Sequence, residues 1–232
     1  MKDRAYQPAY TWAAGTDAAS AAGSPTGRIG TKPFARPTRY PEPFRANRCL
    51  FVNIPGCEGD TIHAALFGGW PPGPVPLRWY ERQFPKHYAA SFKFTFVRDP
   101  VERVYVAWAR WMEARVFVTA ESGEGLDTDE GFDGFVSRWL REEHIHEHVD
   151  FAPQTDFLLD AQGALTLDFI GRFENLKRDF GSLRDFLCTG TSLPWSAPAY
   201  ERPPGSRFPV SAWARRRIRQ VYAQDYALLD FE

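Results

Sequence analysis

A short aromatic run that stops abruptly constrains this chain more than any other feature. Residues 92–97 read Phe-Lys-Phe-Thr-Phe-Val, and Arg98-Asp99-Pro100 follows directly. The run predicts a buried strand. Asp99 can cap a following helix, and proline suits the first helical position. The segment therefore predicts a strand, a turn and a helix start. It also places Arg98 at the carboxyl end of a strand, where open α/β sheets bind ligands, and the site suits a phosphate.

Composition sets the broad class. A chain of 232 residues with 44% hydrophobic residues is long and apolar enough for one globular core. The net charge of −1 gives no overall attraction for nucleic acid or an anionic membrane, so we expect neither as a partner. No apolar run approaches the roughly 20 residues of a membrane span. The oligomeric state is left open by these features.

The cysteines and the start of the chain bear on its location. Three scattered cysteines fit a reducing compartment better than a disulfide framework. Met1-Lys2-Asp3-Arg4 is followed by no apolar segment of the secretory kind. We therefore expect a cytoplasmic protein. Residues 1–46 are rich in small residues and proline without periodicity, which predicts a flexible arm before a single domain over residues 47–232.

Strand-like and helix-like segments alternate after the arm. We expect strands at Cys49–Ile54, Phe92–Val97 and Leu165–Ile170, and rigid or polar loops at 68–84 and 121–131. Helices are expected at Thr61–Phe67, Asp99 to about Phe117, Phe132–His144, Glu174–Leu187 and Val210 to about Leu229, and a turn or short helix at Gln154–Leu159. This alternation predicts an α/β fold with a mostly parallel central sheet flanked by helices.

Five segments occur in a fixed order, and together they resemble a known family. They are the strand, loop and helix over 51–62, the block 92–103, Pro153-Gln154-Thr155-Asp156-Phe157-Leu158, the block 167–176, and Val221-Tyr222-Ala223-Gln224-Asp225-Tyr226. The set covers roughly residues 48–232 and resembles the carbohydrate-type sulfotransferases that use 3′-phosphoadenosine-5′-phosphosulfate (PAPS). The resemblance implies a P-loop-like sulfotransferase fold. It also implies transfer of a sulfuryl group from PAPS to a hydroxyl or amine of a small-molecule or carbohydrate acceptor, with no metal.

The resemblance also implies roles for particular residues. Arg98 falls on the arginine that holds the 3′-phosphate of PAPS. Acceptor deprotonation in such enzymes needs a His, Glu or Lys near the acceptor. The candidates here are His148, Asp150 and Glu58. The loop that would cradle the 5′-phosphosulfate contains Gly56, Cys57, Gly59, Asp60 and Thr61.

The loop departs from the family's pattern, which typically reads Ile-Pro-Lys-Thr-Gly-Gly-Thr-Ser. Gly56 replaces the lysine, Cys57 replaces the first hydroxyl, and Glu58 and Asp60 add two carboxylates. Each carboxylate about 5 Å from a phosphosulfate would cost about 3 kcal/mol at an effective dielectric constant of 20. The lost lysine contact adds about 1.5–3 kcal/mol. The family's serine in the second block falls on Val106.

These departures keep a second hypothesis open. The chain could have the sulfotransferase fold without conventional use of PAPS, and could perform other chemistry or serve as a binding or scaffold subunit. Replacement cations at Lys86, Arg103 or Arg207 would favour the first hypothesis. Arg98 itself has the alternative of a structural ion pair with Asp99, Glu102 or Glu174.

Two further patterns are weaker. His144, His146 and His148 alternate and would share one face of an extended segment, as metal ligands or acid–base groups do, or they lie in a solvated helix end. A metal-dependent enzyme is thus a third hypothesis. Cys57 precedes a predicted helix, which lowers a thiol pKa, but Glu58 and Asp60 oppose this effect. The basic cluster Arg215–Arg219 is either a solvated face or a contact for an anion.

Overall fold

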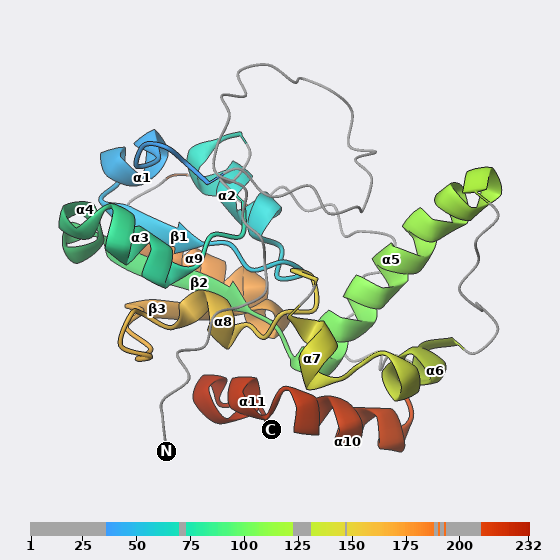
Figure 1. The fold of residues 1–232 in the computed structure, drawn as a ribbon. Helices are drawn as coiled ribbons and strands as arrows, with labels where there is room; N and C mark the ends of the chain where they lie inside the picture. The colour runs from blue at the N-terminus through green and yellow to red at the C-terminus, as the bar shows by residue number, and fades with distance from the viewer. Residues whose placement is uncertain are drawn as a thin grey trace.

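The centre of the fold is a parallel sheet. The computed structural model describes residues 36–69, 73–122, 131–146, 148–187, 190, 193 and 210–232. Side chains are described for all of these residues except 113–122. Within these residues the sheet has three strands in the order β1-β2-β3: β1 (Cys49–Val52), β2 (Phe92–Val97) and β3 (Phe169–Arg172). Both pairings are parallel, so the carboxyl ends of all three strands meet at one edge (Figure 1).

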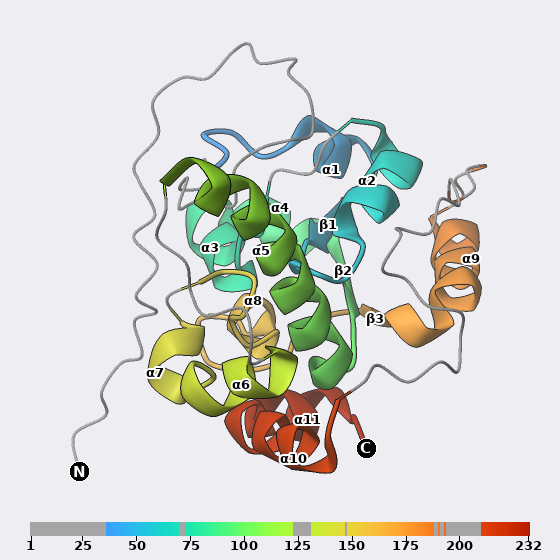
Figure 2. The same ribbon diagram turned by 90° about the vertical axis from the view of Figure 1, so that its right-hand side faces the viewer.

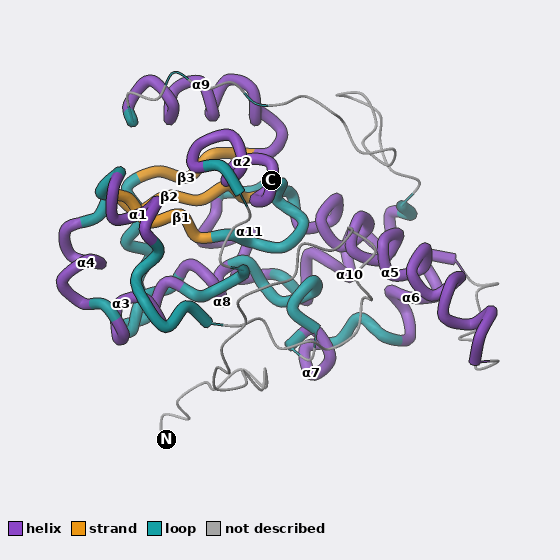
Figure 3. Tube along the Cα trace, turned by 90° about the horizontal axis from the view of Figure 1, so that it is seen from above, coloured by secondary structure: helices purple, strands orange, loops and turns teal. Residues whose placement is uncertain are grey.

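Helices lie on both sides of this sheet. Figure 3 shows α9 on one side and α3 and α8 on the other, which confirms the α/β class. The helices are α1 (Glu42–Ala46), α2 (Gly59–Phe67), α3 (Leu77–Gln83), α4 (Pro85–Ala90), α5 (Pro100–Ser122), α6 (Gly131–Arg138), α7 (Glu142–Ile145), α8 (Thr155–Leu158), the 3₁₀ turn η2 (Phe173–Asn175), α9 (Leu176–Phe186), α10 (Ala212–Val221) and α11 (Ala223–Leu229).

The core has two clusters of apolar side chains. The larger one surrounds the sheet and includes Phe51, Phe94 and Phe96. The smaller one is formed where α5, α6 and α10 pack together, around Val104, Val136 and Ile218. Figure 2 shows α10 lying beneath α5 and α6. The amphipathic spacing on these helices buries one face of each, so the C-terminal helices hold α5 in place.

The strand, turn and helix predicted around Arg98 are confirmed. β2 has the predicted bounds, and α5 begins at Pro100. The Asp99 carboxylate accepts a hydrogen bond from the amide of Glu102 at 3.0 Å, as expected of a helix cap. These features depend on neighbouring residues alone, which explains why the local sequence predicts them well.

Other elements differ from the prediction. β3 begins at Phe169 rather than Leu165, because Asp168 first pairs with Lys93 through backbone and carboxylate contacts. Residues 77–83 form α3 rather than a loop, with Leu77 and Tyr80 buried. The helix expected from Phe132 to His144 ends at Arg138, and a short α7 follows. Of the predicted polar loop, 121–122 belong to α5 and 123–130 lie outside the described residues.

The C-terminal helix is interrupted at Tyr222, where the prediction has it continuous. Tyr222 leaves helical geometry at φ −103° and ψ 29°, which separates α10 from α11. Its hydroxyl donates a 2.6 Å hydrogen bond to the Phe151 carbonyl oxygen inside the core. This long-range contact accounts for the break, since nothing in the local sequence requires one.

The packed region begins earlier than expected. Phe44 is fully buried, Tyr40 is buried beside it, and the Tyr40 hydroxyl donates to the Cys49 carbonyl oxygen at 3.0 Å. The predicted arm therefore cannot extend through Tyr40 to residue 46, and residues 1–35 lie outside the described part of the chain. We extend the proposed single domain back to Tyr40. None of the described helices is both long enough and apolar enough to cross a membrane.

Gly171 tests the packing at the centre of the sheet. It pairs with Phe96 across β2 and β3, and an added Cβ would lie 2.3 Å from the Phe96 Cε1 atom. Phe96 is buried and has little room to move, so we expect Gly171→Ala to lower the free energy of unfolding by about 1–3 kcal/mol. Urea denaturation measures this change.

Gly181 is the matched control for that substitution. It lies inside α9, and an added Cβ would meet nothing within 4 Å. Gly181→Ala should leave stability unchanged or raise it by up to about 1 kcal/mol, because alanine favours a helix over glycine. Equal effects of the two substitutions would contradict this account of the sheet packing.

Candidate active site

The loop between β1 and α2 is held in a conformation that few sequences adopt. Gly56 has φ 82°, and Glu58, which precedes α2, has φ 58° in the left-handed region. An added Cβ on Gly59 would lie 1.7 Å from the Asn53 Oδ1 atom, so this position needs glycine. The amides of the first turn of α2 have no carbonyl partner within the helix, and no side chain caps them. A helix end of this kind can bind an anion.

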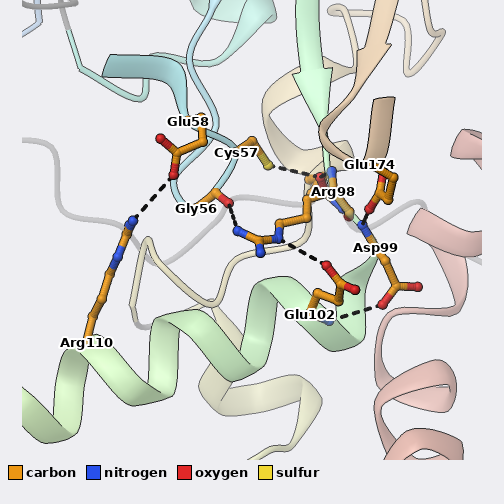
Figure 4. Close-up of polar contacts among 9 residues, drawn as sticks. Gly56, Cys57, Glu58, Arg98, Asp99, Glu102, Arg110 and Glu174 are labelled. Carbon is orange, nitrogen blue, oxygen red and sulfur yellow. Dashed lines mark hydrogen bonds and ion pairs between the residues drawn. The ribbon is translucent and has the colours of Figure 1, made fainter. Parts of the chain in front are cut away.

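Arg98 follows the carboxyl end of β2 and lies against this loop. Its side chain is only 2% exposed. The Nη1 atom donates to the Gly56 carbonyl oxygen at 3.4 Å, and the guanidinium carbon lies 3.7 Å from the centre of the Phe173 ring. Figure 4 shows Arg98 extending from the end of β2 toward Gly56. The alternative ion pair is also present, because Nε lies 3.6 Å from the Glu102 carboxylate.

A buried polar network fixes the backbone at Arg98. The Gln154 side chain accepts from the Arg98 amide at 3.0 Å and donates to the Arg98 carbonyl oxygen at 2.8 Å. The Cys57 thiol also donates to the Gln154 side chain at 3.4 Å. Gln154 therefore joins the end of β2 to the β1–α2 loop.

Asp225 on α11 anchors this network from the far end of the chain. Its carboxylate accepts from the amides of Gln154 and Thr155 and from the Thr155 hydroxyl, at 2.8–2.9 Å. Burial raises the pKa of the Asp225 carboxyl, and the donated amide hydrogen bonds act against that shift. Both segments belong to the ordered motif blocks, and the network gives them a structural role.

Arg103, one of the predicted replacement cations, holds backbone carbonyl oxygens of the loop and its surroundings. Nε donates to the Pro55 carbonyl oxygen at 2.8 Å and Nη1 donates to the Ala152 carbonyl oxygen at 2.7 Å. Arg103 is 1% exposed, and its Nη2 atom has no hydrogen-bond partner among the described residues. Arg103 thus supports the loop through backbone carbonyl oxygens and leaves one buried N–H donor without a hydrogen bond among the described residues.

The two carboxylates of the loop face different partners. Glu58 accepts a hydrogen bond from the Thr61 hydroxyl at 3.1 Å and lies 3.8 Å from the Arg110 guanidinium. Asp60 accepts from the Asn53 amide group at 3.5 Å, and burial raises the pKa of its carboxyl. Of the two, Glu58 is therefore the one whose carboxylate pairs with a cation from α5 (Figure 4).

Asp150 belongs to the same group of charges. Burial raises the pKa of the Asp150 carboxyl, and the positive charges of Arg103, Arg110 and His148 act against that shift. The structure thus brings Glu58 and Asp150 within electrostatic reach of Arg110, and His148 within reach of Asp150. Sequence reasoning missed Arg110 because this residue lies outside the motif blocks. It lies about three helical turns into α5, and the path of α5 brings it to the loop.

The remaining predictions concern the replacement cations Lys86 and Arg207 and the three alternating histidines. Arg207 lies outside the described residues, and Lys86 is exposed on α4. The rings of His144 and His148 both pack near Trp139, whose carbonyl oxygen His144 contacts at 2.8 Å, whereas His146 contacts Asp156 at 3.1 Å. His148 packs against the rings of Trp111 and Trp139. Within the described residues no cluster of three or more metal-binding side chains forms.

Cys57 should be chemically inert in the folded protein. It is 1% exposed, and burial raises the pKa of its thiol to about 12 despite the nearby charges of Arg103 and Arg98. We expect iodoacetamide at pH 8 to leave Cys57 unmodified in native protein and to modify it in urea, as read by peptide mass spectrometry. Rapid modification of the native protein would contradict this burial and revive the reactive-thiol hypothesis.

Comparison with known proteins agrees with the fold and the ordered motif blocks. A profile described as the sulfotransferase family matches residues 75–232, which is more than half of the chain. Searches of curated proteins and of solved structures returned no significant match. The matched region contains Arg98 and the Gln154–Asp225 network and begins after the Gly56–Thr61 loop. This chain belongs to the sulfotransferase family.

Proposed function

We propose that this protein transfers a sulfuryl group from PAPS to a hydroxyl or amine of a small-molecule or carbohydrate acceptor. Family membership supports the reaction class. The observation that carries the proposal is the contact of the buried Arg98 guanidinium with Gly56 in the β1–α2 loop, at the carboxyl edge of a parallel sheet. A fixed cation and uncapped amides meet there, and both suit an anionic sulfuryl donor.

The hydrogen-bond donors and cations of the site fit the anionic groups of PAPS, and the Glu58 carboxylate is the one obstacle. PAPS supplies an activated sulfuryl group when bound. Arg98, Arg110 and the first-turn amides of α2 would hold its anionic groups, and Arg103 would add positive charge beneath them. The Glu58 carboxylate now lies among these donors and must turn away to admit a second anion.

Asp150 and His148 are the proposed groups that take the acceptor's proton. Burial raises the pKa of the Asp150 carboxyl, which makes it a better base at neutral pH than an exposed aspartate. His148 lies close enough to Asp150 to interact with it electrostatically, and its neutral imidazole is the form that could accept a proton. Either group would receive the proton as the acceptor oxygen or nitrogen attacks sulfur. Glu58 remains a third proposed candidate.

A second candidate function is supported by the same charges. Glu58, Asp60 and Asp150 all interact with Arg110, so three carboxylates share this cation, and Arg103 also acts on Asp150. A site of that composition suits a cationic or amine ligand. The protein would then use the sulfotransferase fold for binding, or for chemistry that does not need PAPS.

The two candidates are separated by a turnover assay. The full-length protein is incubated with PAPS and a panel of saccharides, alcohols and amines, and release of 3′-phosphoadenosine-5′-phosphate (PAP) is measured with mass analysis of each acceptor. Acceptor-dependent PAP release supports sulfuryl transfer. Its absence for every acceptor, together with amine binding that PAPS does not displace, favours the second candidate.

We also propose a cytoplasmic location. Cys49 and Cys57 are both buried free thiols, which fits a reducing compartment.

A further inference from the structure

Glu58 lies in the β1–α2 loop, which the family resemblance assigns to the phosphosulfate of PAPS. Glu58 immediately precedes α2, and its side chain is only 11% exposed. The Thr61 hydroxyl, in the first turn of α2, donates to this carboxylate instead of remaining open to a ligand. The chain thus supplies a negative charge of its own to the start of the helix, where negative charge is favourable.

Arg110 supplies the positive charge that the loop itself lacks. Residues 53–61 contain no lysine or arginine. Arg110 comes from α5, and its Nη2 atom lies 3.8 Å from Glu58. Figure 4 shows its side chain rising from α5 to the loop and ending at the Glu58 carboxylate. A guanidinium therefore stands at the loop although the lysine position is Gly56.

Buried donors beneath the loop provide an independent sign of an anion site. Arg103 Nη2 is buried with no hydrogen-bond partner among the described residues, and Arg103 packs directly under Gly56. Arg98 is buried beside it, with Nη1 on the Gly56 carbonyl oxygen at 3.4 Å and Nε in a 3.6 Å ion pair with Glu102. A buried charged group is costly to leave with an unpaired donor, so Arg103 Nη2 points to a ligand with acceptor oxygens.

We propose that Glu58 is an internal occupant of this anion site, and that Arg110 is a binding residue which an incoming phosphate or phosphosulfate takes over from Glu58. The anion forms an ion pair with Arg110 as the Glu58–Arg110 ion pair breaks, and no covalent bond changes. The identity of the natural ligand rests on the proposed function. The exchange of one anion for another at Arg110 does not.

A double-mutant cycle tests the exchange. PAP and inorganic pyrophosphate are titrated separately into wild type, Glu58→Gln, Arg110→Gln and the double variant. Glu58→Gln should tighten binding about tenfold or more, because a tenfold change corresponds to the removal of about 1.4 kcal/mol of competition. Arg110→Gln should weaken binding by a similar factor. The gain from Glu58→Gln should largely vanish in the Arg110→Gln background.

Asp60→Asn is the matched control, since it removes the neighbouring carboxylate, which contacts Asn53. An equal gain from Glu58→Gln with and without Arg110, or an equal gain from Asp60→Asn, would show general repulsion and overturn the exchange. Pyrophosphate binding with the predicted pattern but no PAP binding would support the exchange and count against PAPS. PAP binding unaffected by either residue would overturn the exchange and leave the proposed function intact. Failure of Glu58→Gln to bind either probe would also overturn it.

Discussion

Replacement of Asp225 by alanine should unfold the protein or lower its free energy of unfolding by about 3–5 kcal/mol, the cost of breaking a buried charged network. Asp225 is fully buried and accepts four hydrogen bonds from Gln154 and Thr155. Alanine would leave these donors without acceptors in the core. Urea denaturation followed by tryptophan fluorescence measures the loss.

Two variants make this expectation specific. Asp185 is an exposed aspartate on α9 that pairs with Arg184, and Asp185→Ala should change stability by less than about 1 kcal/mol. Asp225→Asn keeps the shape and one acceptor oxygen, so it should lose less stability than Asp225→Ala. A stability of Asp225→Ala within about 1 kcal/mol of wild type would contradict the network, because unsatisfied buried donors cost at least that much.

Replacement of Arg98 by methionine should weaken PAP binding by about 10- to 100-fold, the range expected for losing a charge-assisted hydrogen bond. The side chain lies at the loop and carries a positive charge that its partial pairing with Glu102 leaves available to a ligand. Methionine fills most of the same volume beside Phe173 without the charge. Isothermal titration measures the affinity.

Arg98 is buried, so folding must be checked beside binding. Arg98→Lys keeps the charge and should recover part of the affinity, although it cannot reproduce the planar guanidinium over Phe173. Arg178→Met on the surface of α9 is the control for loss of a cation far along the chain, and should bind PAP like wild type. Unchanged PAP affinity in folded Arg98→Met would show that Arg98 is only structural.

Local signals account for what the sequence predicts well. The alternating run over 92–97, the capping aspartate and the helix-starting proline act within a few residues of one another, so β2 and the start of α5 follow from them. α3 is harder to predict, because prolines and glycines just before it favour a loop while its helical spacing is short. Burial of Leu77 and Tyr80 against the sheet cluster stabilises it in the folded chain.

Contacts between residues far apart in the sequence account for the features that the sequence alone does not predict. The Gln154–Asp225 hydrogen bonds join residues 71 positions apart, and the Gln154–Arg98 hydrogen bonds join residues 56 apart. No periodicity or turn preference encodes such pairs. The same holds for Arg110, whose contact with Glu58 depends on how α5 crosses the β1–α2 loop. The sequence alone predicts an unfavourable loop with two carboxylates, while the structure gives one of them a cationic partner.

The most direct test of the central claim is titration of wild-type protein with PAP, the product that sulfuryl transfer leaves from PAPS. Adenosine diphosphate, which lacks the 3′-phosphate, serves as the control nucleotide. We predict micromolar binding of PAP and much weaker binding of adenosine diphosphate. Absence of PAP binding at millimolar concentration would contradict a PAPS-dependent function for this site.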